Sequence, residues 1–109
     1  MKVKKEEFVF LYAEDTRVRH LHKRIRNRVI EFVVQLELLI DNKWWPVIRY
    51  DTSHGFAHKD IIDPSGKVEK IPMPIQDFNE ALILAEEELR VEWEIFRMRY
   101  LQKKRGGGR

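Results

Sequence analysis

Apolar residues alternate along residues 29–40, and this alternation limits the fold more than any other feature of the chain. One side of the segment carries apolar side chains: Ile30, Phe32, Val34, Leu36, Leu38 and Ile40. The other side mixes polar and apolar residues, among them Glu31, Gln35 and Glu37. A period of two with β-branched residues predicts a strand that is buried on one face. The chain therefore needs a sheet and an element that covers its apolar side.

Turn residues follow this strand and predict a hairpin. Asp41-Asn42-Lys43 is a turn by composition, and residues 44–50 return as aromatic and β-branched chain. Pro46 cannot donate a ladder hydrogen bond, so it marks a sheet edge, a strand start or a bulge.

Other segments predict further strands. Residues 57–63 and 67–71 flank the turn Asp63-Pro64-Ser65-Gly66 and form a second predicted hairpin. Near the start of the chain, residues 8–12 and 17–21 predict two more short strands.

A long helix is predicted from Asp77 onward. Asp77 can cap the helix, and Glu80 stands three residues later in a capping-box arrangement. An apolar stripe follows at steps of three and four: Phe78, Leu82, Ala85, Leu89, Trp93, Phe96 and Tyr100. One such stripe needs one surface to cover, and the sheet provides it.

The predicted fold class is α+β, an antiparallel sheet of five or six strands packed against one long C-terminal helix. We expect a single domain over residues 1–105 and a flexible glycine-rich tail over residues 106–109.

Composition excludes several kinds of protein. The chain of 109 residues has no cysteine, which rules out disulfides, thiolate metal sites and cysteine nucleophiles. No apolar run reaches the length of a membrane span and no signal-peptide pattern opens the chain, so we expect a cytoplasmic protein. Charged residues make up 36% of the chain, a bias that hints at a thermophilic source.

Basic residues concentrate in residues 17–28, where no acid occurs. They are Arg17, Arg19, Lys23, Arg24, Arg26 and Arg28. Such a concentration is typical of a surface that binds nucleic-acid phosphates, and it is equally typical of a solvated strand face. Both interpretations stay open at this point.

Most of the residues that could carry chemistry lie between Arg49 and Asp60. The group comprises Arg49, Tyr50, Asp51, His54, His58 and Asp60, with Gly55 at the centre. Histidine beside aspartate suggests proton transfer or metal binding, because the pKa of imidazole lies closest to neutrality. If both flanking segments are strands, Arg49 and Asp51 share one face, and Tyr50 takes the other.

Three interpretations of this segment compete. In the first, His54 and His58 act as general base and acid on an RNA 2′-hydroxyl and leaving oxygen, while Arg49 holds the phosphate and Tyr50 adds a hydrogen bond. In the second, His54, His58 and one or both aspartates bind a divalent metal such as zinc. In the third the segment is structural: Asp51 caps the loop, His58 donates a buried hydrogen bond and Arg49 pairs with Asp60. Of the two chemical roles we favour acid–base work without a metal or other cofactor.

The segments Phe32-Val33-Val34-Gln35-Leu36-Glu37 and Arg49-Tyr50-Asp51-Thr52-x-His54-Gly55-Phe56-x-His58-x-Asp60 resemble a family of small archaeal and bacterial proteins. The likeness covers residues 29–101. More distantly, the chain resembles the TumE-like toxins of bacterial toxin–antitoxin pairs. Asp60 stands where those toxins have a further histidine. The resemblance implies a small endoribonuclease that a helix-turn-helix antitoxin neutralises.

We therefore expect a toxin-like ribonuclease or another protein that acts on RNA, with Asp51, Tyr50, His54 and His58 as its catalytic residues. Nucleic acid would be bound by Arg49 and by the six basic residues of segment 17–28. The alternative is a binding module for nucleic acid or protein in which the histidine loop is structural. A homodimer formed through the helix stripe or a sheet edge is a further possibility.

Overall fold

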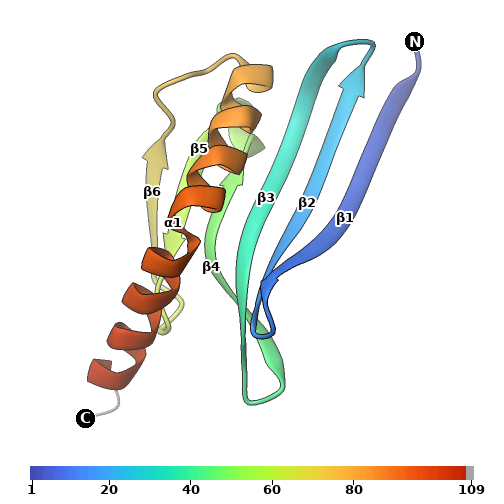
Figure 1. The fold of residues 1–109 in the computed structure, drawn as a ribbon. Helices are drawn as coiled ribbons and strands as arrows, with labels where there is room; N and C mark the ends of the chain where they lie inside the picture. The colour runs from blue at the N-terminus through green and yellow to red at the C-terminus, as the bar shows by residue number, and fades with distance from the viewer. Residues whose placement is uncertain (108–109) are drawn as a thin grey trace.

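The computed structural model describes residues 1–107 and shows a six-stranded antiparallel sheet with one long helix on one face (Figure 1). The elements are β1 (Val3–Ala13), β2 (Thr16–Ile25), β3 (Arg28–Ile40), β4 (Lys43–Asp51), β5 (His58–Ile62), β6 (Val68–Pro72) and α1 (Phe78–Gly107). Each strand pairs with the next one along the chain, in the order β1-β2-β3-β4-β5-β6. The predicted α+β class with a C-terminal helix is confirmed.

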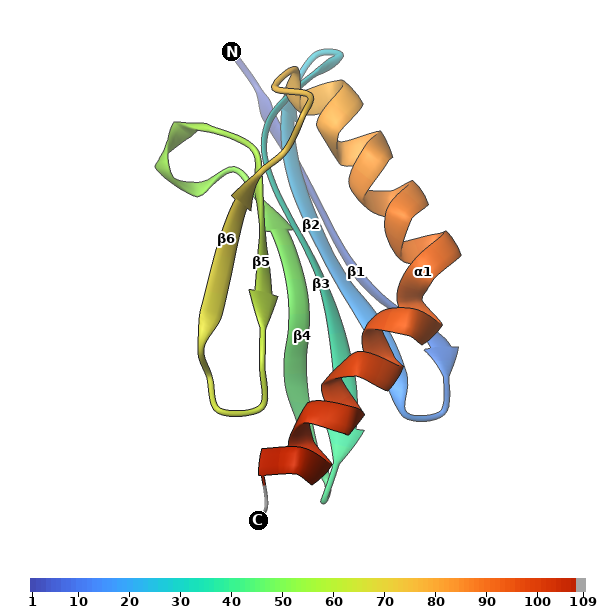
Figure 2. The same ribbon diagram turned by 90° about the vertical axis from the view of Figure 1, so that its left-hand side faces the viewer.

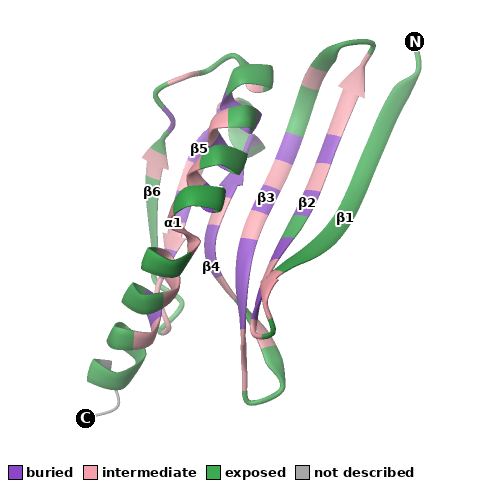
Figure 3. Ribbon diagram, in the orientation of Figure 1, coloured by how far each residue is buried: buried purple, intermediate pink, exposed green. Residues whose placement is uncertain are grey.

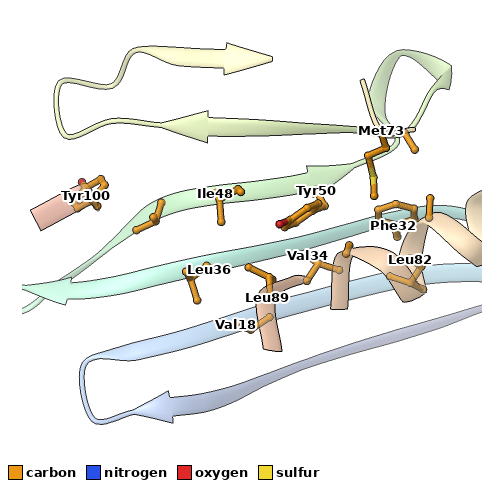
Figure 4. Close-up of a cluster of buried hydrophobic side chains, with 14 of the residues drawn as sticks. Val18, Phe32, Val34, Leu36, Ile48, Tyr50, Met73, Leu82, Leu89 and Tyr100 are labelled. Atoms are coloured by element: carbon orange, nitrogen blue, oxygen red, sulfur yellow. The ribbon is translucent and has the colours of Figure 1, made fainter. Parts of the chain in front are cut away.

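The alternation along β3 decides which face α1 covers. Phe32, Val34, Leu36 and Leu38 are buried, and α1 packs against β3. Buried residues of β3 are purple in Figure 3. In β4, Tyr50 lies opposite Val34 and points to the same side (Figure 4). The helix contributes buried apolar residues to this layer: Ala81, Leu82, Ala85 and Leu89. We call this side of the sheet the covered face, and the side without a helix the open face.

Two local predictions about β3 and β4 are confirmed. Asp41 and Asn42 have φ of 52° and 64°, the left-handed pair that a two-residue hairpin turn requires. Beside Pro46 the pairing shifts, since Leu36 lies opposite Ile48 and Glu37 opposite Pro46. Val47 is thus the extra residue of a β-bulge.

The N-terminal end of α1 agrees with the predicted cap at Asp77. Asp77 Oδ1 accepts a hydrogen bond from the Glu80 amide at 3.1 Å. The helix ends at Gly107, inside the expected tail, because glycine keeps the backbone donor that a helix needs even though it favours one less. Residues 108–109 of that tail lie outside the described residues.

Candidate functional site

The residues between Arg49 and Asp60 form a site on the open face, at the end of β4 and the start of β5. The loop between these strands projects on the side of the sheet away from α1 (Figure 2). Asp51 is the last residue of β4 and lies directly opposite His58, the first residue of β5. Arg49 lies opposite Asp60. These four side chains therefore converge from two paired strands.

Local hydrogen bonds fix the loop. Asp51 Oδ1 accepts from the amide of Ser53 at 3.0 Å and from its hydroxyl at 2.8 Å. Thr52 ties the loop to β3, since its hydroxyl oxygen accepts the Phe32 amide at 3.0 Å. His54 has φ of 67° and Gly55 has φ of 84°. A left-handed conformation suits glycine but strains His54, and such strain is common at functional sites.

His58 lies at the centre of a polar cluster that we call the Asp-His cluster: Asp51, His58, Asp60 and Lys70. His58 Nε2 is 2.9 Å from Asp51 Oδ1 and 3.7 Å from Asp60 Oδ1. The ammonium group of Lys70, on β6, is 3.0 Å from His58 Nε2 and 3.1 Å from Asp60 Oδ1. The His58 side chain is 0% exposed, and Asp51 and Asp60 are also buried.

The cluster continues into a chain of polar side chains across the open face. Arg49 Nη1 is 3.9 Å from Asp60 Oδ2, and Arg49 Nε donates to Gln35 Oε1 at 2.7 Å. Gln35 donates to Glu37 Oε2 at 2.5 Å, and Arg17 Nε donates to Glu37 Oε1 at 2.6 Å. Every buried side-chain polar atom of the described residues has a partner, so this face carries a satisfied network.

Tyr50 does not join this site. Its side chain is buried on the covered face, where its hydroxyl donates to Glu88 of α1 at 2.6 Å. Lys59 Nζ holds the same Glu88 oxygen at 2.9 Å. Burial and the nearby Glu88 raise the pKa of Tyr50 far above its ordinary value. The expected catalytic role of Tyr50 therefore has no support in the geometry, because the pleat puts it on the opposite face from Asp51.

His54 is exposed on the loop, and its ring centroid lies 6.3 Å from that of His58. The two imidazoles are thus neighbours, but only one faces solvent. The third interpretation of this segment matches several contacts: Asp51 caps the loop, His58 is buried beside Asp51, and Arg49 lies near Asp60.

The basic residues of segment 17–28 are distributed over three places. Arg17, Arg19 and Lys23 point to the open face, where Arg17 also lies over the Trp44 ring at 4.1 Å. Arg24 has turned to the side of Glu6, at 3.4 Å. The remaining two residues are exposed, Arg26 in the turn between β2 and β3 and Arg28 at the start of β3.

Sequence reasoning missed the contribution of Lys70, Gln35 and Glu37 to the open face. Lys70 could have been found from the second hairpin, because the turn at residues 63–66 fixes a register that pairs Lys70 with Asp60. In the sequence, Gln35 and Glu37 stand out only as polar positions of an alternating strand, which does not indicate that they contact Arg49 and Arg17.

The comparisons place the chain in a family. A model of the Domain of unknown function (DUF7718) matches residues 3–106, and the chain belongs to that family. Comparison with curated proteins and with solved structures gave no significant match. Among the described residues, α1 lacks the apolar length that a helix needs to cross a membrane.

Proposed function

We propose that this protein binds RNA through one end of its sheet, where cations of β1 and β2 oppose one another. Lys4 lies directly opposite Arg24, and Lys5 lies directly opposite Lys23. Like charges that are directly opposite across an antiparallel pair destabilise the sheet. A bound polyanion would remove this repulsion, so these two pairs are the observation that carries the proposal.

The neighbouring turn adds two further cations. We define the basic end as Lys4, Lys5, Lys23, Arg24, Arg26 and Arg28. Three carboxylates lie close to it: Glu6 at 3.4 Å from Arg24, Glu7 at 3.2 Å from Lys5 and Glu31 at 2.9 Å from Lys23. The basic end thus has six positive side chains and three nearby carboxylates, and this excess of positive charge favours binding of a phosphate backbone.

The basic end and the Asp-His cluster lie at the same end of the sheet. Asp51 is opposite Val33, the sixth residue of β3, and the Thr52 amide donates to Phe32 O at 3.2 Å. On the open face of β2, Leu21 lies at the level of Asp51, and exposed Arg19 lies two residues further on, opposite Gln35. A single strand held at the basic end can therefore extend along the open face toward His54. RNA is preferred over DNA because of the resemblance to toxin ribonucleases.

The test is binding of a fluorescein-labelled oligouridine, measured by fluorescence anisotropy over a series of salt concentrations. The double variant R26Q/R28Q should weaken binding. The slope of the logarithm of the binding constant against the logarithm of the salt concentration should also become less negative by about 0.7 for each phosphate that the protein no longer neutralises. The control K43Q/K67Q removes the same charge from the turns at the opposite end and should change neither quantity. Equal losses of affinity in both variants, or no binding by the unmodified protein, would refute the basic end as the RNA site. A deoxy oligonucleotide bound equally well would remove the preference for RNA.

Cleavage of the bound RNA is the second candidate function, and the adjacency of His54 and His58 favours it. Exposed His54 would accept the proton of the 2′-hydroxyl as that oxygen attacks the phosphorus, and His58, held by Asp51, would donate a proton to the leaving 5′-oxygen. We expect cleavage in the presence of EDTA that is abolished in H54A and in H58A while circular dichroism shows folded protein. Full cleavage by H54A, or none by the unmodified protein, would reject this chemistry.

A helix-turn-helix antitoxin, a homodimer and a cytoplasmic location stay predictions. An antitoxin would bind this protein tightly enough to abolish its action on RNA. Co-expression with the product of the adjacent gene, followed by size-exclusion chromatography with light scattering, separates a complex with that product from a homodimer and from a monomer.

A further inference from the structure

Three ligand atoms of the Asp-His cluster converge on one point from two paired strands. Oxygens of Asp51 and Asp60 and the Nε2 atom of His58 all lie within 4.8 Å of one another. Asp51 and His58 are a register pair, and Asp60 is two residues along β5 on the same face. Their side chains are 9%, 0% and 8% exposed, so the three groups are placed by the sheet and not by mobile loops.

The hydrogen bonds around His58 Nε2 are mutually incompatible. A single ring nitrogen carries either a proton or a lone pair. Asp51 Oδ1, at 2.9 Å, requires a donor there, whereas the ammonium of Lys70, at 3.0 Å, requires an acceptor. One of the two contacts is therefore unfavourable in either tautomer. A divalent cation in place of the ammonium would bind the lone pair and both carboxylates together.

The groups around these three atoms would also hold them in place for a metal. His58 Nδ1 is 3.2 Å from Phe56 O, and donation there leaves Nε2 with its lone pair toward the two carboxylates. The Ser53 amide and hydroxyl fix the Asp51 carboxylate. Backbone and side-chain partners of this kind orient metal ligands and set the histidine tautomer.

We propose that Asp51, His58 and Asp60 form a binding site for a divalent first-row cation such as Mn²⁺ or Zn²⁺, and that Lys70 leaves the site when the cation enters. One imidazole and two carboxylates suit these cations, and no sulfur ligand is present to select a softer ion. Lys70 can leave because its side chain is 42% exposed on β6. Arg49 stays near Asp60 Oδ2 and offsets part of the negative charge.

Cation binding at this site does not depend on RNA binding at the basic end, and it assigns the Asp-His cluster a separate role. A cation bound to Nε2 occupies the lone pair that His58 would need as a base. RNA cleavage at a loaded site would therefore follow the cation and would not use the two-histidine route. Cation binding can be measured without RNA, so failure of either proposal leaves the other standing.

The experiment is isothermal titration of the EDTA-treated, dialysed protein with Mn²⁺ and, separately, with Zn²⁺. We expect one cation per chain. D60N, which preserves the size of the side chain, should weaken binding at least about tenfold, since it removes a ligand charge. K70Q should strengthen binding about tenfold, since it removes the competing ammonium. K67Q, an equal change at the next lysine before β6, should have no effect.

Folding of each variant is checked by its thermal transition. The proposal is overturned if neither cation binds saturably to the unmodified protein or to K70Q. Binding that persists unchanged in folded D60N but disappears in H22Q would place the cation among His20, His22 and Glu6 and would overturn the assignment as well.

Discussion

His58 is fully buried although it lies on the face of the sheet that no helix covers. The loop after β4 folds over it, with the Phe56 ring centroid 5.0 Å from that of His58. Asp51 anchors this loop and also contacts the imidazole, so one carboxylate combines a structural role with a place in the candidate site. At the scale of single residues, Asp51 therefore both stabilises the loop and belongs to the candidate site.

The matched pair of Asp51 and Asp63 separates these two roles. Each accepts bonds from the amide and hydroxyl of the serine two residues later, but Asp63 lies in the exposed turn before β6 and pairs with no histidine among residues 1–107. In EDTA, D51A should lower the free energy of unfolding by about 2–4 kcal/mol, because His58 is left without its buried partner. D63A should lower the free energy of unfolding, measured by urea denaturation, by less than D51A does. Equal decreases in the two variants would show that His58 gains nothing from Asp51.

At the scale of elements, Glu88 joins α1 to two strands on the covered face. It accepts the Tyr50 hydroxyl from β4 at 2.6 Å and the Lys59 ammonium from β5 at 2.9 Å. These contacts explain why Tyr50 serves the fold and lies away from the cluster.

Y50F should therefore lower the free energy of unfolding by about 1–2 kcal/mol, since it removes a buried hydrogen bond to a carboxylate. RNA and cation binding should be unchanged. Y100F is the control: Tyr100, on α1, is also buried, and no hydrogen bond from its hydroxyl occurs among the described residues, so the decrease in stability should be smaller. A loss of cation binding in Y50F would contradict this placement.

The same face of β2 carries a histidine pair that makes stability depend on pH. His20 Nε2 and His22 Nδ1 are 2.7 Å apart, and both side chains are buried near Glu6. Burial, and then the neighbouring His22, lowers the pKa of His20 below its ordinary 6.5. The unfolded chain thus binds this proton at a higher pH than the folded chain does.

The free energy of unfolding should therefore be unaffected by His20 above about pH 6.5, and it should decrease as the pH drops below that value. H20Q should reduce this slope in urea denaturation between about pH 5.5 and 7.5, whereas H54Q, on the exposed loop, should leave it as in the unmodified protein. A slope in H20Q equal to that of the unmodified protein would show that other groups cause it.

At the scale of the whole molecule, local patterns predicted the fold well. The alternation in β3, the turn at Asp41-Asn42, the bulge beside Pro46 and the cap at Asp77 each depend on a few neighbouring residues, and all four are confirmed. These signals also predicted one helix over one face of the sheet. Local sequence was sufficient because every strand pairs with its neighbour in the chain.

The candidate site was less predictable because it depends on contacts between distant residues. Lys70 meets His58 only after the register of β5 and β6 is set, and Glu37 joins Arg17 across 20 positions. Burial of His58 depends on how the loop folds, which no periodicity reveals. The alternation of side chains along a strand predicted that Tyr50 and Asp51 lie on opposite faces of the sheet, and that part of the prediction is confirmed.

The whole molecule places its opposed cations and its buried cluster at one end, and binding of RNA at that end is the central claim. The most direct test is a titration of ¹⁵N-labelled protein with oligouridine, followed by the chemical shifts of backbone amides. We predict shifts at residues 4–5 and 23–28 and none at residues 64–67 in the turn at the opposite end. Shifts confined to that opposite turn and the last turns of α1, or no shifts at saturating RNA, would contradict the claim.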